Sequence, residues 1–108
     1  MKIAVIGSPG VTVSNLDKYL PPAAMEIVVN GEHDADQSAR EHAAAHDLKV
    51  TEFLPEYEKY ADLAIQKRNV AMVEYADLVL AFWDGQDRGI KNVMDYCNKT
   101  KMSIRVFV

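Results

Sequence analysis

Five short runs of apolar, mostly β-branched residues recur along the chain, and their spacing is the feature that most constrains its fold. The first four runs end in glycine, proline or asparagine-rich turns, and the stretches between runs carry helical patterns. The runs are apolar on both faces instead of alternating, which is typical of buried parallel strands. We predict strands at Lys2–Ile6, Glu26–Val29, Leu48–Leu54, Asp77–Phe82 and Ile104–Val108.

The segments between these runs predict helices. Asp34–His46 is rich in alanine and acidic in its first turn, where the helix dipole favours acidic residues. Gly89–Thr100 carries an apolar stripe, and Glu56–Ala76 is long enough for one helix or two. Ser14–Leu20 predicts a short, weak helix that Pro21 ends. The alternation predicts a Rossmann-like α/β three-layer sandwich of about five mainly parallel strands, with helices on both faces.

Length and charge limit the classes of partner. The 108 residues suit a single domain, 1–108, with one modest core. The net charge is -4, so duplex nucleic acid is not expected as a partner. A lone cysteine, Cys97, fits a reducing compartment and core packing. The apolar N-terminal run is too short for a signal peptide and no segment predicts a membrane span, so we expect a cytoplasmic protein.

The candidate site lies in the loops that follow the predicted strands, because open parallel sheets bind ligands outside the carboxyl ends of their strands. Gly7-Ser8-Pro9-Gly10 follows the first strand directly. Glycine lets a backbone approach a phosphate, and a helix N-terminus attracts an anion. The loop has two glycines where a dinucleotide fingerprint has three at another spacing, so an ordinary strand-to-helix turn is an open alternative.

The second loop, Asn30-Gly31, leads into an acidic segment. Glu32, Asp34 and Asp36 surround one turn, where they oppose a bound phosphate by charge repulsion. Asp34 or Asp36 also suits a helix cap or first turn. The sequence therefore leaves both a ligand contact and a structural role open for this loop.

Arg68 and the fourth loop supply the remaining candidates. Arg68-Asn69 falls on an inward helical stripe, which predicts either a structural ion pair or a contact to an anion or ribose. Trp83 can stack on a base or pack at the core, and Asp84 can accept hydrogen bonds from ribose hydroxyls. His42 and His46 share a helix face, but no carboxylate or cysteine at metal-ligand spacing accompanies them, so no metal site is predicted.

Short motifs follow one another in a fixed order over nearly the whole chain: Gly7-Ser8, Gly31, Ala35-Asp36, Arg68-Asn69, Ala76-Asp77, Ala81-Phe82-Trp83-Asp84-Gly85 and Gly89. This order resembles the YspA-like branch of the SLOG superfamily, which groups Smf/DprA-like proteins with the LOG, or lysine decarboxylase-like, nucleotide-processing proteins. The resemblance implies a Rossmann-like domain that binds nucleotides or their derivatives. Some relatives hydrolyse the bond between base and ribose in nucleoside monophosphates.

The chain departs from that family pattern at its phosphate loops. Pro9 stands where the family tends to have arginine, and Asn30 and Asp34 stand where glycines are usual. Asp87 and Ile90 replace a serine and a threonine, and Val93 occupies the position of the hydrolases' glutamate. These changes remove a cation and add carboxylates, so a phosphate would bind poorly unless Mg²⁺ intervened.

Three functions remain open from the sequence. The first is binding of a nucleotide or nucleotide derivative with little or no catalysis. The second is a nucleotide or nucleoside N-glycosidase, in which Asp36 or Asp84 acts as acid or base and Arg68 holds phosphate. The third is a degenerate scaffold that works through protein contacts, and self-association through a helix is a further expectation. The predicted ligand contacts are Gly7, Ser8, Gly31, Asp36, Arg68, Asn69, Trp83, Asp84, Gly85 and Gly89.

Overall fold

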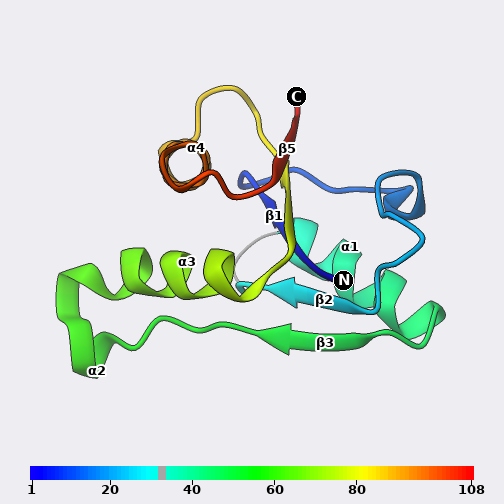
Figure 1. The fold of residues 1–108 in the computed structure, drawn as a ribbon, viewed down its shortest axis with the longest axis horizontal. Coiled ribbons are helices and arrows are strands. Elements are labelled where there is room, and N and C mark those ends of the chain that lie inside the picture. Colours follow the sequence, from blue (N-terminus) through cyan, green and yellow to red (C-terminus); the bar gives the residue numbers. More distant parts are fainter. Residues whose placement is uncertain (32–33) are drawn as a thin grey trace.

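A five-stranded, all-parallel sheet forms the centre of the molecule (Figure 1). The computed structural model describes residues 1–31 and 34–108. The strand order is β3-β2-β1-β4-β5, which confirms the predicted α/β sandwich. The strands are β1 Lys2–Gly7, β2 Glu26–Val29, β3 Lys49–Glu52, β4 Leu78–Phe82 and β5 Ile104–Phe107.

Helices cover both faces of this sheet, on opposite sides of the strands (Figure 1). They are α1 Asp34–Ala45 on one face, and α3 Ala64–Tyr75 and α4 Arg88–Thr100 on the other; the short helix α2 Tyr57–Tyr60 has no buried residue. The connections β1–β2 and β2–β3 both run over one face, and the connections β3–β4 and β4–β5 run over the other. Right-handed crossovers require this division, because the chain reverses its direction across the sheet after β3.

The core lies in two layers, one on each side of the sheet. Ile3 and Val5 of β1 pack on the side of α1, whereas Ala4 and Ile6 pack on the side of α3 and α4. Successive side chains of a strand point to opposite faces, so a strand covered on both faces must be apolar throughout. This explains the central strands β1, β2 and β4. The edge strands β3 and β5 are only partly buried, which the sequence did not predict.

One predicted helix takes a different form in the structure, and in a second stretch the structure decides between one helix and two. Ser14–Leu20 contains only a 3₁₀ turn, η1 Leu16–Lys18, because its few apolar residues anchor a loop and do not make a helical stripe. The stretch from Glu56 to Ala76 is divided into α2, a 3₁₀ turn η2 Ala61–Leu63, and α3. The break falls at Ala61, whose φ of 49° is incompatible with a continuous helix.

Among the remaining predicted elements, Glu26–Val29 matches β2 at both ends, and the others differ from the structure by one to a few residues at their ends. The strand predicted at Leu48–Leu54 is shortened to Lys49–Glu52, and the last strand ends at Phe107. Over the described ranges, no helix combines the length and the apolar character that crossing a bilayer requires.

The sheet brings the loops after β1 and β4 side by side. Gly7 pairs with Phe82 at the carboxyl ends of these strands. The chain leaves β1 toward β2 and leaves β4 toward β5, so this pair marks the point where the topology reverses. Ligands of open α/β sheets bind in the crevice at such a point.

Candidate functional site

Ser8 joins the loops that follow β1 and β4. Its side chain is fully buried, its backbone N–H donates to the carbonyl of Phe82 at 2.9 Å, and its Oγ accepts the N–H of Asp84 at 3.0 Å. A buried hydroxyl must find a hydrogen-bond partner, and here the neighbouring loop supplies it. The Ser8 side chain therefore fixes the geometry of the crevice from within.

The carboxylate of Asp84 shapes its own loop. Its Oδ1 accepts the N–H groups of Gln86 and Asp87, each at 2.8 Å. These two backbone donors, Asp87 first, hold the pKa of Asp84 below its usual value, so the group stays ionised at neutral pH. Gly85 adopts a φ of 87° at the tip of this turn, a conformation that suits glycine.

Asp87 caps α4. Its Oδ2 accepts the N–H of Ile90 at 2.9 Å, while its carbonyl accepts the indole N–H of Trp83 at 3.0 Å. The carboxylate thus occupies a backbone donor that a phosphate would use at this helix N-terminus. Trp83 is half-buried against the core on the side of α3 and α4, where it ties the loop to that core.

Gly31 and Asp36 fasten the turn between β2 and α1. The buried Asp36 accepts the N–H of Gly31 on Oδ1 at 3.2 Å and the Nε of Arg40 on Oδ2 at 2.9 Å. Arg40 also pairs with Glu52 at the end of β3. The i,i+4 spacing of Asp36 and Arg40 was the sequence signal for this pair, which our motif analysis missed. Of the three carboxylates predicted around this turn, Glu32 lies outside the described residues.

Arg68 reaches from α3 to the carboxyl end of β2. Its side chain is 5% exposed, its Nη1 donates to the carbonyl of Asn30 at 3.3 Å, and its Nε donates to Asn69 Oδ1 at 2.9 Å. The inward placement that the helical stripe predicted is confirmed. These contacts orient the guanidinium at the crevice, where it is the buried cation among the described residues.

A cleft opens beside Arg68, between α3 and α4. A smaller part of about 50 Å³, which we call the Arg68 end, is lined mainly by apolar surface and also by Asn30, Arg68, Asn69 and Asp87. An adjoining part of about 260 Å³ is mainly apolar and is lined by residues that include Val70, Val73 and Tyr96. The two parts share Ile65, Asn69, Gly89 and Val93. We call them together the α3–α4 cleft.

The predicted ligand contacts therefore separate into two groups. Arg68, Asn69 and Gly89 line the α3–α4 cleft. Ser8, Asp36, Trp83 and Asp84 make the hydrogen bonds that hold the loops around it. The remaining glycines shape the backbone: Gly7, Gly31 and Gly85.

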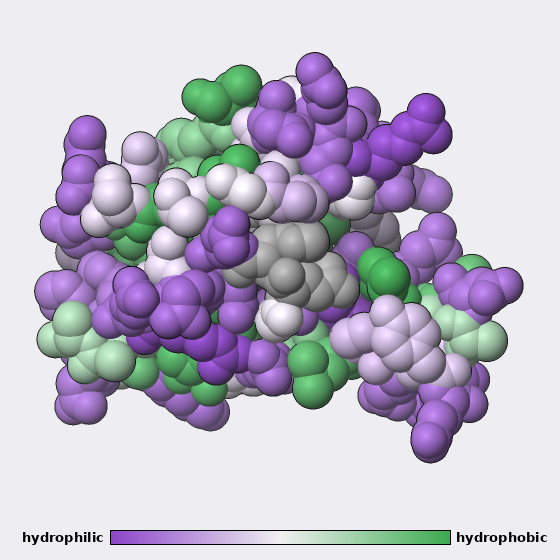
Figure 2. Space-filling view, turned by 180° about the vertical axis from the view of Figure 1, so that it is seen from behind, coloured by the Kyte–Doolittle hydropathy of each residue, from purple (hydrophilic) through white to green (hydrophobic). Residues whose placement is uncertain are grey.

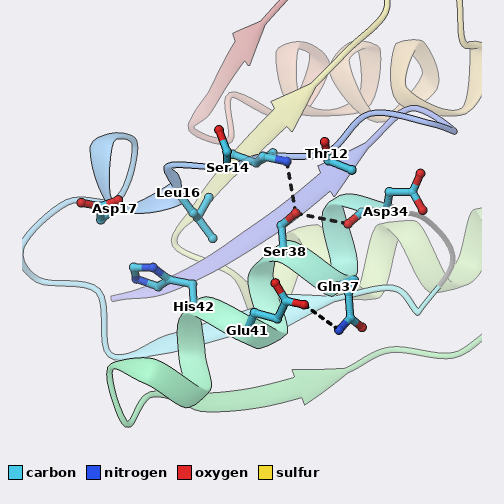
Figure 3. Close-up of a pocket in the computed structure, with 10 residues that line it drawn as sticks. Thr12, Ser14, Leu16, Asp17, Asp34, Gln37, Ser38, Glu41 and His42 are labelled. Atoms are coloured by element: carbon cyan, nitrogen blue, oxygen red, sulfur yellow. Dashed lines mark hydrogen bonds between the residues drawn. The ribbon is translucent and has the colours of Figure 1, made fainter.

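A larger cleft lies on the other face of the sheet, where the sequence motifs gave no signal. It measures about 520 Å³ and separates the β1–β2 connection from the outer surface of α1 (Figure 3). We call it the α1 cleft. This face is predominantly hydrophilic (Figure 2). Sequence analysis missed it because it depends on how an irregular connection packs on a helix.

The two helical histidines do not build a metal site in the part of the chain that the structure describes. The rings of His42 and His46 lie against each other with centroids 4.2 Å apart, and no group of three metal-ligating side chains is found among the described residues. Comparison with protein-family models, curated proteins and solved structures yields no match. The resemblance to the SLOG superfamily stays a prediction.

Proposed function

We propose that this protein binds a small nucleotide-type molecule in the α3–α4 cleft. The observation that carries the proposal is Arg68, a residue that is only 5% exposed yet lines the wall of a cleft at the point of topological reversal. A mostly apolar cleft with a few polar groups at one end is the usual anatomy of a small-molecule site. The Arg68 end suits a ribose, and the apolar wall beside Tyr96 suits a base.

The dimensions of the cleft favour a small ligand. Its larger part measures about 260 Å³ and the Arg68 end about 50 Å³. Sites for drug-sized ligands measure roughly 300–1,000 Å³, so this cleft lies at the lower limit. A nucleoside or a mononucleotide derivative fits this size better than a dinucleotide.

Charge around the cleft disfavours multiple phosphates. Asp87 lines the Arg68 end and caps the N-terminus of α4, and Asp84 lies in the same loop. Each carboxylate near a phosphate costs on the order of 1–4 kcal/mol, depending on the local dielectric. Arg68 offsets one such charge. A ligand with at most one phosphate is therefore favoured, and Mg²⁺ would be needed for more.

Binding without catalysis is favoured over N-glycosidase activity. Asp36 accepts hydrogen bonds from Gly31 and Arg40, and Asp84 accepts two from its own loop. A general acid or base must reach the reacting atoms of its substrate. Neither carboxylate lines the α3–α4 cleft, which supports a binding role.

The test is thermal unfolding of the protein with nucleosides, nucleoside monophosphates, NAD and ADP-ribose, each with and without Mg²⁺. A ligand at about 100 times its Kd adds about 2.7 kcal/mol to the free energy of unfolding. Asn92→Trp, which fills the cleft from an exposed position on α4, should abolish the shift. Asn98→Trp on the same helix should leave it unchanged. No shift with any ligand, or a shift that Asn92→Trp preserves, would refute the proposal.

A second variant tests the charge argument. Asp87→Ser keeps a good N-cap residue on α4 but removes a carboxylate from the cleft. We expect it to strengthen binding of a nucleoside monophosphate by about fivefold or more and to leave the matching nucleoside unaffected. Asp95→Ser removes a carboxylate from the same helix outside the cleft and serves as the control. Equal effects of the two variants would contradict the argument.

Exposed apolar side chains support protein contact as a second candidate function. Leu54, Tyr57, Leu63 and Ile65 are 59%, 58%, 52% and 42% exposed, and they follow one another around α2 and η2. Hydrophobic atoms are exposed among hydrophilic ones toward the lower right of the space-filling view, the side on which α2 lies (Figure 2). Such patches mark interaction surfaces. Sedimentation analysis that shows concentration-dependent association, reversed by Leu63→Glu, would support this function; a monomer at every concentration would refute self-association.

A further inference from the structure

The side-chain amide of Asn69 has a fixed orientation in the α3–α4 cleft. Asn69 lies on α3 and lines both parts of the cleft, so it is located where the two parts meet. Its Oδ1 accepts the Nε–H of Arg68 at 2.9 Å. The guanidinium of an arginine only donates hydrogen bonds, so the amide must turn its oxygen toward Arg68 and its NH₂ group away from it.

The NH₂ group of Asn69 is available to a ligand. Its Nδ2 donates no hydrogen bond to a described residue. Across the described part of the chain, no buried side-chain nitrogen or oxygen lacks a partner. Asn69 is half-buried, so its Nδ2 must keep accessible surface. The cleft wall therefore contains a hydrogen-bond donor whose direction is set by a buried arginine.

The wall around this donor is mainly apolar. In the larger part of the cleft it is formed by Val70 and Val73 of α3 and Val93 of α4, among others. The two other amides in this part, Gln66 and Asn92, are exposed to water. A donor set in an apolar wall discriminates between ligands, because a ligand that offers no acceptor displaces water and leaves the donor without a partner.

The position of the donor determines which ligand atom it meets. This step rests on the proposed function, in which the ribose lies at the Arg68 end and the base lies along the apolar wall. The glycosidic bond then lies where the two parts of the cleft meet, beside Asn69. Every common base carries an acceptor next to that bond, N3 in purines and O2 in pyrimidines.

We propose that Asn69 is a specificity-determining residue that donates from Nδ2 to this acceptor. The contact selects nucleosides by an atom that purines and pyrimidines share. It does not involve the exocyclic groups that distinguish one base from another, so the cleft accepts several bases and is strict at one atom.

The test compares adenosine with two analogues by calorimetric titration of the whole protein. The buffer is mildly alkaline, so that all three bases are neutral. In 3-deazaadenosine a C–H group replaces N3, and in 7-deazaadenosine a C–H group replaces N7 on the other edge of the base. We expect 3-deazaadenosine to bind about three- to tenfold more weakly than adenosine, because one neutral hydrogen bond is lost. The affinity of 7-deazaadenosine should match that of adenosine.

Asn69→Asp is the matched variant. It keeps an oxygen for the Nε–H of Arg68 and replaces the donor by a second acceptor. Adenosine should lose its advantage over 3-deazaadenosine in this variant, whereas a purely structural role for Asn69 would weaken both ligands equally and preserve the advantage. Asn98→Asp adds the same charge at an exposed position of α4 outside the cleft and should preserve it too.

Failure of this inference is distinguishable from failure of the proposed function. Equal binding of adenosine and 3-deazaadenosine, both abolished by Asn92→Trp, would overturn the role of Asn69 and leave the cleft as a nucleoside site. An advantage of adenosine that survives in Asn69→Asp would overturn it as well. If adenosine does not bind, the inference is overturned, and the other ligands of the thermal unfolding panel decide whether the proposed function holds.

Discussion

The substitution Gly7→Ala should destabilise the fold through a steric clash between β1 and α1. A Cβ at Gly7 would lie 2.6 Å from the Cβ of Ala35, whereas ordinary contacts begin near 3.4 Å, so the two elements must separate by about 0.8 Å. An alanine methyl has no rotamer that relieves the contact. Overpacking of this kind costs about 1–3 kcal/mol, and the reduced entropy of the unfolded chain returns about 0.4–1 kcal/mol. The net expected loss is about 1–2 kcal/mol.

A double-mutant cycle isolates this contact. Ala35→Gly removes the opposing methyl group, at a cost of about 1 kcal/mol in helix propensity. Gly7→Ala combined with Ala35→Gly should be more stable than the two separate losses predict, by about 1–2 kcal/mol. Urea unfolding measures these free energies, and Gly7→Ala alone should lower the thermal midpoint by about 4–16 °C, at roughly 4–8 °C per kcal/mol. Additivity within about 0.5 kcal/mol would refute the assignment of Gly7 to packing.

Two further outcomes follow from the loops and from α1. Ser8→Ala should cost about 1–3 kcal/mol in urea unfolding, because the N–H of Asp84 loses its partner, whereas the exposed Ser14→Ala should cost little. Burial and His46 lower the pKa of His42 in the folded protein below its ordinary value of 6.5. His42 therefore contributes stability that is fully present above pH 6.5 and is lost as the pH falls through the pKa of the folded protein. His42→Gln should flatten the fall in stability between about pH 7 and pH 5; an unchanged slope would contradict this.

Much of the fold could be predicted from local sequence patterns. The central strands could be predicted because both of their faces are buried, which requires an uninterrupted apolar run such as Ile3–Ile6. The helix predicted at Asp34–His46 followed from its alanine content and acidic first turn, and that at Gly89–Thr100 from its apolar stripe; the structure has them at Asp34–Ala45 and Arg88–Thr100. The pattern failed at residues 14–20, which carry no long apolar stripe, and it left open whether residues 56–76 form one helix or two.

The candidate site was predicted less completely. The inward position of Arg68 followed from its helical stripe, and tertiary structure added the carbonyl of Asn30 as its partner. The sequence could not show that Ser8, Asp84 and Asp87 bond to neighbouring backbone groups. Such bonds depend on which N–H groups the folded loops bring near a side chain.

The sequence by itself determined the type and order of the elements, and with them the edge of the sheet where a ligand site was expected. Only the tertiary structure decided which polar residues at that edge make hydrogen bonds within the loops and which line a cleft. It also decided that Asp17 and Asp34 share a second cleft on the opposite face. The physical reason is that periodicity reports burial, which is local to each element, whereas clefts and hydrogen bonds arise between segments distant in the chain.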